Sequence, residues 1–335
     1  MIITEYCDNE NGIAVLRQPL ERYLHDDIVS DNTDVLRQLS LIDRTAQSDA
    51  PIMIEGEKGT GKEHFAQYAY TRSRRFGKQY MYFNALSVSR DHYGSELFGS
   101  PAGQEGVLSR TNGGTLFIND VNLLPQDIQR QLLTAISIPK VSDGKPEFDI
   151  RLIGSYTCSD DDSRDLSGLT EELYYYISIL KIQVPPLRRR REDILLLSMF
   201  FLDQVNQSYG LDYHFSWEVL ASMIEMDWPD NIRQLKYTVE RMVWLTEGAT
   251  IDNMALLADC VKPMGNTNPL QETHFPQSIP ENENRSLKEM VADYERMIIR
   301  QYIKKYGSLR KAAKALQVAP ASLSRKLNAS DDEKE

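Results

Sequence analysis

Short apolar runs of strand length recur through the first half of the chain, separated by loops or by segments of helix length. Runs of about four to eight residues that are rich in β-branched and aromatic side chains are typical of buried strands. Because these runs alternate with helical segments, they predict an α/β unit with a largely parallel sheet. The five runs are PIMIEG (51–56), YMYFNAL (80–86), TLFIND (115–120), DIRLIGSY (149–156) and ILKIQVPP (179–186).

Helical periodicity appears on both sides of these runs. Val35, Leu36, Leu39 and Ile42 share one face of a helix predicted within 33–47. Beyond residue 187 the strand pattern disappears, and stretches such as EDILLLSMFFLDQV and RQLKYTVERMVWL predict an all-helical unit. A stretch with four prolines and few apolar side chains (VKPMGNTNPLQETHFPQSIPENEN) is typical of a linker, and helical signal resumes in SLKEMVADYERMIIRQYIKKY.

These changes of pattern divide the chain into segments. They are a leader (1–26), an α/β unit (27–186), a helical unit (187–258), a linker (259–284), a C-terminal helical unit (285–330) and an acidic tail (331–335). The leader is too short to form a sensor domain with a core of its own.

The composition is that of an ordinary globular protein, with 335 residues, 41% of them hydrophobic and 26% charged. No apolar run approaches the ~18 residues that span a bilayer. The N-terminal MIITEYCDNENG lacks the basic start and apolar core of a signal peptide. Cys7, Cys158 and Cys260 are scattered, which argues against a disulfide framework or a zinc site. We therefore expect a cytosolic protein with no metal centre and no membrane partner.

The net charge of −11 is unevenly distributed along the chain. Residues 285–330 hold 11 lysines and arginines against 3 acidic residues, so this segment carries +8 and the remainder −19. A basic end on an acidic body predicts a small nucleic-acid-binding module at the C-terminus. The alternative is a basic helix that is simply solvated.

The first apolar run leads into GEKGTGKE, in which Gly56, Gly61 and Lys62 satisfy all but the last position of the phosphate-loop pattern G-x-x-x-x-G-K-[ST]. Glycines let backbone N–H groups curl around phosphate oxygens, and the helix that follows points its positive end at them. The pattern predicts a nucleotide site, with a loop that is only a fold element as the alternative. The predicted contacts are Gly56, Glu57, Lys58, Gly59, Thr60, Gly61, Lys62 and Glu63.

Five ordered landmarks give the chain a family resemblance: GEKGTGKE, SELFG (95–99), GGTLFIND (113–120), VPPLRRRREDI (184–194) and WPDNIRQL (228–235). They resemble the bacterial enhancer-binding proteins, AAA+ ATPases that activate RNA polymerase carrying the RpoN-type sigma factor. The resemblance covers about 27–258 and the C-terminal helices. It implies an α/β AAA+ core with a five-stranded sheet, a helical lid and a Fis-like helix-turn-helix. It also implies that Asn119, Asp120 and Arg233 lie at the nucleotide, and that Asn84 matches the asparagine that restrains the family's catalytic glutamate.

Several positions depart from what the resemblance implies for catalysis. The family's strand reads GGTLFLDE, whose Asp holds magnesium and whose Glu polarises water, whereas this chain has Asn119 and Asp120. An amide carries no charge for a hard dication, and aspartate is one methylene shorter than glutamate. The positions of the family's two arginine fingers hold Thr170 and Tyr176, and its sensor asparagine is Thr157. We expect binding of ATP or another nucleotide without turnover and no catalytic residue. The alternative is an active ATP-hydrolysing activator.

The interval between SELFG and GGT holds only SPAGQEGVLSRTN, without the GAFTGA loop with which the family grips its sigma factor. The chain is similar in these respects to the VpsR-type regulators of biofilm genes. That resemblance implies action with RNA polymerase carrying a housekeeping sigma factor, and a response to cyclic di-GMP. The candidate contacts for this second messenger are Arg188, Arg189, Arg190 and Arg191. The alternative is that these arginines are solvated or paired with the acidic body.

The basic end contains GSLRKAAKALQVAPASLSRKLN (307–328), which fits a helix-turn-helix with Pro320 at the first position of the recognition helix. We expect Leu316, Val318, Leu323 and Leu327 to form its core. The predicted base contacts are Ala321, Ser322, Ser324 and Arg325, and the predicted phosphate contacts are Lys311, Lys314 and Lys326. This end resembles the Fis-like ending of the same family, which dimerises through the preceding helix. We therefore predict promoter DNA as a partner and a homo-oligomer, dimeric or larger.

Overall fold

The computed structural model describes residues 6–10, 12–16, 18–100, 103–137, 147–158 and 168–261, together with Lys311 and Ala313. The chain forms two compact units, Met1–Pro263 and Met264–Glu335, and the first contains nearly all of the described residues. In the second unit Lys311 is exposed and Ala313 is buried, both within helix. The other predicted DNA contacts and core residues lie outside the described residues: Lys314, Ala321, Ser322, Ser324, Arg325 and Lys326, and Leu316, Val318, Leu323 and Leu327.

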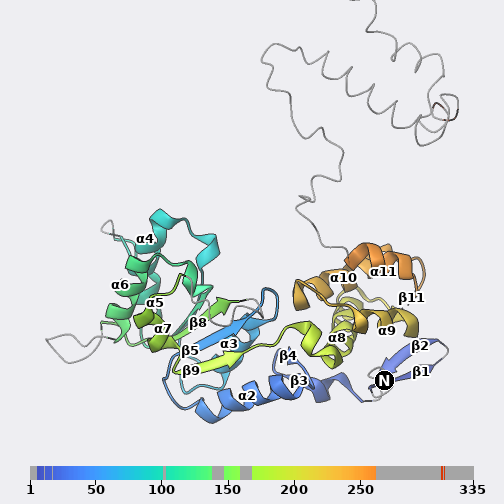
Figure 1. Ribbon diagram of the computed structural model, residues 1–335, viewed down its shortest axis with the longest axis horizontal. Coiled ribbons are helices and arrows are strands. Elements are labelled where there is room, and N and C mark those ends of the chain that lie inside the picture. Colours follow the sequence, from blue (N-terminus) through green and yellow to red (C-terminus); the bar gives the residue numbers. More distant parts are fainter. Residues whose placement is uncertain are drawn as a thin grey trace, which may run out of the picture. The chain divides into compact units, whose positions relative to one another are not determined.

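A five-stranded parallel sheet forms the centre of the first unit, with strand order β6-β7-β8-β5-β9 (Figure 1). Its strands are β5 (Ile52–Gly56), β6 (Tyr80–Asn84), β7 (Thr115–Asn119), β8 (Arg151–Thr157) and β9 (Leu180–Gln183). The five apolar runs therefore do form the predicted parallel sheet. Gly56 pairs with Thr157 and Asn84 pairs with Asn119, so the carboxyl ends of β5, β6, β7 and β8 meet at one edge.

Alternate residues of each central strand serve two hydrophobic cores, one on each face of the sheet. On β5, for example, Ile52 and Ile54 belong to the core under two helices, while Met53 belongs to the core on the opposite face. The first face is covered by α2 (Thr33–Thr45) and α3 (Lys62–Thr71). The second face is covered by α4 (Tyr93–Phe98), α5 (Val107–Thr111), α6 (Gln126–Ser137) and α7 (Glu171–Ile177). The result is a three-layer α/β/α arrangement.

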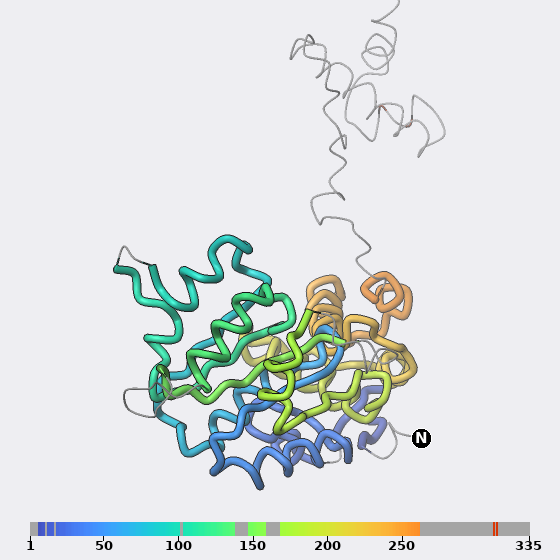
Figure 2. The backbone as a smooth tube through the Cα atoms, turned by 60° about the vertical axis from the view of Figure 1, so that its left-hand side comes forward, coloured from blue at the N-terminus to red at the C-terminus, as the bar shows by residue number. Residues whose placement is uncertain are grey.

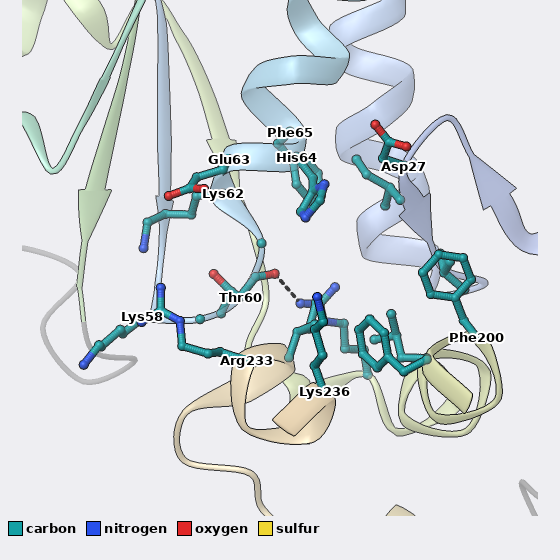
Figure 3. Close-up of a pocket in the computed structure, with 18 of the residues that line it drawn as sticks. Asp27, Lys58, Thr60, Lys62, Glu63, His64, Phe65, Phe200, Arg233 and Lys236 are labelled. Carbon is teal, nitrogen blue, oxygen red and sulfur yellow. Dashed lines mark hydrogen bonds between the residues drawn. The ribbon is translucent and has the colours of Figure 1, made fainter. Parts of the chain in front are cut away.

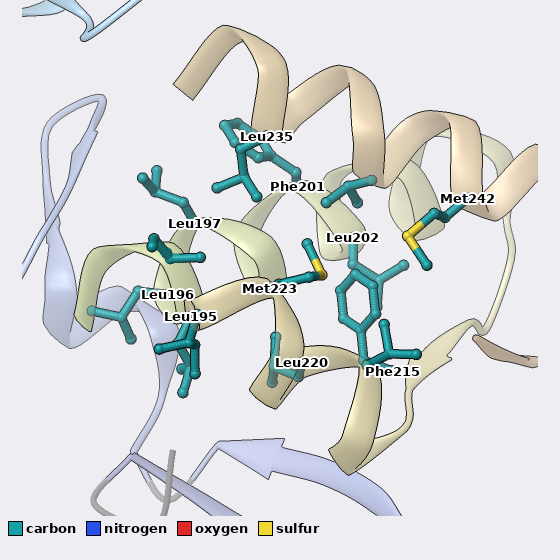
Figure 4. Close-up of a cluster of buried hydrophobic side chains, with 14 of the residues drawn as sticks. Leu195, Leu196, Leu197, Phe201, Leu202, Phe215, Leu220, Met223, Leu235 and Met242 are labelled. Carbon is teal, nitrogen blue, oxygen red and sulfur yellow. The ribbon is translucent and has the colours of Figure 1, made fainter. Parts of the chain in front are cut away.

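The helical unit begins directly after β9 with a short 3₁₀ turn, η5 (Leu187–Arg189). It contains α8 (Arg191–Tyr209), α9 (Trp217–Glu225), α10 (Asn231–Leu245) and α11 (Met254–Val261). These helices pack around one apolar core, part of which is shown in Figure 4. The unit differs from the all-helical prediction by a two-residue parallel pair, β10 (His214–Phe215) with β11 (Thr250–Ile251). Strands this short contain no alternation that a sequence pattern could reveal.

The segment predicted as a leader packs onto the helical unit. It contains the antiparallel hairpin β1 (Cys7–Glu10) and β2 (Ile13–Leu16), then η1 (Leu20–Tyr23) and β3 (Leu24–His25). The strand that pairs with β3, β4 (Ile28–Val29), belongs to the predicted α/β unit. Cys7, Ala14, Tyr23 and Val29 are buried in the same core as the helices, and the two views place the hairpin beside them (Figure 1, Figure 2). Because the N-terminal segment packs against the helices, three consecutive residues of α8, Leu195–Leu197, are all buried.

In the part of the chain that the structure describes, no helix combines the length and apolar character needed to cross a bilayer.

Among the described residues, the largest fully buried side chain is that of Trp228, which lies between α9 and α10. Its indole Nε1 donates to the carbonyl oxygen of Met223 at 2.9 Å, so its polar atom is satisfied inside the core.

Replacing Trp228 with alanine should therefore lower the free energy of unfolding by about 3–5 kcal/mol, because a large cavity and a lost hydrogen bond act together. Trp244→Ala is a matched control, since that indole is 57% exposed and packs edge-on against Tyr209. The control should cost at most about 1 kcal/mol. Urea denaturation followed by circular dichroism measures both, and equal losses would contradict the described core.

Candidate functional site

The loop after β5 forms one wall of the site. Gly59 and Gly61 have φ angles of 76° and 98°, in the left-handed region that side chains other than glycine rarely adopt. This curl places Lys62 at the first residue of α3, so the amide groups of the loop and the positive end of the helix dipole lie together (Figure 3). The predicted order of strand, glycine loop and helix is present.

The ammonium group of Lys62 is folded back against the ends of two strands. Its Nζ donates to the carbonyl oxygens of Gly56 at 2.9 Å and Glu57 at 3.0 Å, and to Oγ1 of Thr157 at 2.9 Å. Burial lowers the pKa of Lys62, and the negative charge of Asp120 opposes that shift. The lysine thus has three acceptors in place of water.

The two strand-end residues that replace the family's acids are engaged with β8. Asn119 Oδ1 accepts from Ser155 Oγ at 2.7 Å, and the same hydroxyl oxygen accepts from the backbone N–H of Asp120 at 2.9 Å. Asp120 Oδ1 accepts from Thr157 Oγ1 at 2.6 Å. The structure therefore brings Lys62, Asn119, Asp120 and Thr157 together, and Thr157 links the lysine to the aspartate.

The positions of the two arginine fingers have local structural roles instead. Thr170 is buried and caps the N-terminus of α7, with its Oγ1 accepting from the backbone N–H of Leu173 at 3.4 Å. Tyr176 packs against the core between the sheet and α4–α7, and burial raises the pKa of its hydroxyl. Neither residue lines the cleft beside the loop, and neither carries a positive charge.

A cleft of about 390 Å³ separates the phosphate loop from β4, α8 and α10. Of the predicted nucleotide contacts, Lys58, Gly59, Thr60, Gly61, Lys62, Glu63, Asn119, Asp120 and Arg233 line it. Gly56 and Glu57 do not. A side chain at Gly56 would lie 2.7 Å from the carbonyl oxygen of Val184, and the Glu57 carboxylate faces the helical unit.

The far wall of the cleft is apolar, and no sequence motif indicated it. Val29, Leu197, Phe200, Phe201 and Ile232 line this wall, and Lys236 lies at its rim. The volume and the pairing of a cationic loop with a flat apolar wall suit a nucleotide, with phosphates at the loop and a base against the wall. These residues come from three separate elements and share no motif, so only the fold reveals them.

Two other predicted residues of this region accept hydrogen bonds from groups of the protein. Oε1 of Glu63 accepts from the Tyr82 hydroxyl at 2.9 Å, and Oδ1 of Asn84 accepts from the Leu86 N–H at 3.1 Å. Among the described ranges there is no group of three or more His, Cys, Asp or Glu side chains arranged to hold a metal ion.

The four consecutive arginines lie where the sheet unit meets the helical unit. Arg188 donates to both carboxylate oxygens of Glu57, at 2.7 and 2.8 Å. Arg190 is buried and donates to the carbonyl oxygen of Thr60 at 2.8 Å. Arg191 pairs with Glu225 at 2.7 Å, and Arg189 is the exposed member. Two of the predicted second-messenger contacts thus bond to the phosphate loop itself.

The partner of Arg190 is a buried acid. Asp193 lies 3.7 Å from the guanidinium and accepts from Ser30 Oγ at 2.7 Å and from the Asp31 N–H at 3.0 Å. Burial raises the pKa of Asp193 to about 6, against the opposing effects of Arg190 and these two donors. This network joins the start of α8 to the segment that leads into α2.

Three family models match successive parts of the chain between residues 28 and 329. The family described as Sigma-54 interaction domain matches residues 28–183, AAA+ ATPase lid domain matches 188–273, and Helix-turn-helix domain matches 284–329. The transcriptional activator RocR of Bacillus subtilis is 29% identical over 324 residues, which cover 91% of this chain and 68% of RocR. The regulatory protein LuxO of Vibrio vulnificus is 30% identical over 310 residues, covering 88% of this chain and 67% of LuxO.

Among solved structures, NtrX from Brucella abortus in complex with ADP is similar, with a TM-score of 0.61 and 26% identity over 90% of this chain and 69% of that one. The chain thus spans about two thirds of the length of these three proteins. The AAA+ sheet, the helical lid and the C-terminal helix-turn-helix match together and in the same order. The chain belongs to the family of sigma-54-dependent transcriptional regulators, the bacterial enhancer-binding proteins.

Proposed function

We propose that this protein is a sequence-specific DNA-binding transcription regulator whose AAA+ domain binds a nucleotide without hydrolysing it. One observation carries the proposal: an intact phosphate loop stands beside strand ends at which Asn119 and Asp120 replace the family's catalytic acids, and both are hydrogen-bonded to β8. A site that binds a nucleotide needs fewer groups than a site that hydrolyses it, and this site has only the groups needed for binding.

Nucleotide binding is supported by the cleft. Lys58, Lys62, Arg233 and Lys236 supply positive charge around it, and Phe200 lies on its apolar wall. The Gly59–Gly61 backbone and Lys62 would hold the phosphates, and the apolar wall would take the base. NtrX, which shares the fold, was crystallised in complex with ADP. ATP or ADP is accordingly the ligand we propose for this cleft.

The lack of turnover follows from what hydrolysis requires. A magnesium ion prefers carboxylate ligands, and the Asn119 amide is neutral with its oxygen already accepting from Ser155. A general base must lie within reach of the attacking water, but Asp120 is shorter than the family's glutamate and bonds to Thr157. Arginine fingers are worth about 10³–10⁵ in rate in other phosphoryl-transfer enzymes, and Thr170 and Tyr176 offer no such charge.

We propose further that the protein does not remodel the RpoN-type sigma factor and acts with RNA polymerase carrying a housekeeping sigma factor. The segment that replaces the sigma-gripping loop is compact. Ser100 N donates to the Gln104 carbonyl and Gly103 N to the Ser100 carbonyl, each at 3.0 Å, and Gly99 bridges to Glu105. The chain then enters α5 directly, so no extended loop projects between 103 and 113.

Cyclic di-GMP as an effector stays a prediction. Its proposed contacts are the arginines beside the phosphate loop. Arg188, Arg190 and Arg191 bond to Glu57, Thr60 and Glu225. A dinucleotide that used the whole run would have to compete with Glu57 and Glu225 for these guanidinium groups.

Hydrolysis can be tested with purified protein, ATP, magnesium and duplex DNA in a phosphate-release assay. We expect the wild type to release phosphate no faster than Lys62→Ala, which lacks the phosphate-binding charge. The double substitution Asn119→Asp with Asp120→Glu should restore little, because the finger positions still lack arginine. Turnover in the wild type that Lys62→Ala abolishes would favour the alternative, an active ATP-hydrolysing activator.

DNA binding can be tested by fluorescence anisotropy of the full chain on a set of duplexes at several salt concentrations. Affinity should fall steeply with salt, because phosphate contacts release counterions. Lys311→Ala should weaken all duplexes alike and reduce the salt slope by about 1, whereas Arg325→Ala should reduce discrimination between sequences. The exposed Lys78 of the first unit is the matched control, and its alanine variant should bind as the wild type does. An equal effect of the three substitutions would contradict DNA binding by the C-terminal segment.

A further inference from the structure

The helical lid donates hydrogen bonds to the outer side of the phosphate loop. The carbonyl oxygen of Lys58 accepts from Asn231 Nδ2 at 3.0 Å, that of Gly59 accepts from the Arg233 N–H at 3.4 Å, and that of Thr60 accepts from Arg190 at 2.8 Å. Three successive peptide groups of the loop are therefore each fixed by a donor from the lid.

The side chain that precedes these peptides is held by the same unit. Both carboxylate oxygens of Glu57 accept from Arg188, and Oε2 also accepts from Asn231 Nδ2 at 3.1 Å. Charge-assisted and bidentate bonds of this kind are the stronger and more directional ones in proteins. Glu57 does not line the cleft, so its carboxylate serves the contact between loop and lid.

Asn231 is the centre of this contact. It is fully buried, begins α10 and has a φ angle of 52°, a conformation that asparagine tolerates better than most residues. Its Oδ1 accepts from the backbone N–H of Leu187 at 2.7 Å, which orients the amide so that Nδ2 faces the loop. The lid and the phosphate loop approach each other closely here, since a side chain at Gly59 would overlap the carbonyl oxygen of Asp230.

In a trans peptide the carbonyl oxygen and the following N–H point in opposite directions. Holding the carbonyls of residues 58–60 against the lid therefore fixes the direction of the N–H groups of Gly59, Thr60 and Gly61. None of these three N–H groups donates to another described residue. They are the groups with which such a loop binds phosphate.

We infer that Asn231 and Arg188 are positioning residues for nucleotide binding: the lid holds the peptide planes of the phosphate loop in their binding orientation. The inference rests on the proposed nucleotide binding and adds that the lid controls the affinity for the nucleotide. Because the bonds link the loop to the lid, nucleotide affinity depends on the position of the lid, and by reciprocity the nucleotide biases the lid. A domain that does not hydrolyse its nucleotide could in this way still pass on whether a nucleotide is bound.

The sharpest test is Asn231→Asp, which changes the polarity of one group and little else. Its Oδ1 still accepts from Leu187, but it cannot donate to Lys58 or Glu57 and places a second negative charge beside Glu57. We expect the Kd for ADP, measured by titration calorimetry on the full chain, to rise about tenfold or more, the equivalent of one or two lost hydrogen bonds.

A second substitution should reverse part of this loss. In Glu57→Gln with Asn231→Asp, the new glutamine amide can donate to the new carboxylate, so the bond between side chains 57 and 231 returns with opposite polarity, while the Lys58 carbonyl still lacks its donor. The Kd should therefore fall below that of Asn231→Asp and stay above that of the Glu57→Gln single variant. This recovery does not require residue 231 to contact the nucleotide. It would also show that Asn231→Asp does not act by destabilising the fold in general, because Glu57→Gln would not reverse such an effect.

Hydrogen exchange at the Arg233 amide, whose N–H donates to the Gly59 carbonyl at 3.4 Å, is measured without nucleotide and gives a readout that does not depend on the ligand. Exchange should be faster in Asn231→Asp and slower again in the double variant. Thr238→Val is the control, because Thr238 is buried on α10 two turns beyond Asn231 and should alter neither quantity. Unchanged exchange and unchanged affinity in Asn231→Asp would overturn the inference. Failure of the wild type to bind ADP would instead overturn the proposed function, while the exchange measurement would still decide whether the lid holds the loop.

Discussion

The ammonium group of Lys62 is buried where β5, β7 and β8 end, and a buried cation must be surrounded by acceptors if the fold is to remain stable. Here two carbonyl oxygens of the loop and the hydroxyl of Thr157 fill that role, and the hydroxyl donates its own hydrogen bond to Asp120. The arrangement fixes the curl of the loop, the start of α3 and the orientation of both strand-end residues. Lys62 contributes to the positive charge of the cleft together with Lys58, Arg233 and Lys236.

The departures from the family's catalytic pattern agree with one another because each has a structural role in this fold. Asn119 bonds to Ser155, Asp120 bonds to Thr157, and Thr170 caps α7. At these positions no buried charge is left without a partner. Removing single catalytic groups from a site built around them would leave such an unpaired charge. The nucleotide cleft and its connections to the lid are intact, which is the pattern expected of a domain that binds and signals without turnover.

The sequence predicted the parts of the structure that have local signatures. The five strands, the glycine loop and the apolar face of α2 each show in the sequence as a pattern of residues that lie close together in the chain.

The packing of β1 and β2 on the lid was not predicted, because strands of four residues carry little periodicity. Neither was the bond between Glu57 and Arg188, nor that between Lys58 and Asn231, since these partners lie more than 130 residues apart. The arginine run was noticed for its charge, but its role in holding the loop depends on contacts that no motif encodes. The DNA contacts beyond Lys311 stay predictions.

The fate of a bound nucleotide tests the central claim most directly. The full chain would be incubated with ATP and magnesium, passed rapidly through a desalting column and denatured, and the released nucleotide identified by anion-exchange chromatography. Binding without turnover predicts that stoichiometric nucleotide is recovered as intact ATP after long incubation, and that Lys62→Ala retains none. Recovery of ADP from the wild type, increasing with the time of incubation, would contradict the account and make this protein an ATPase.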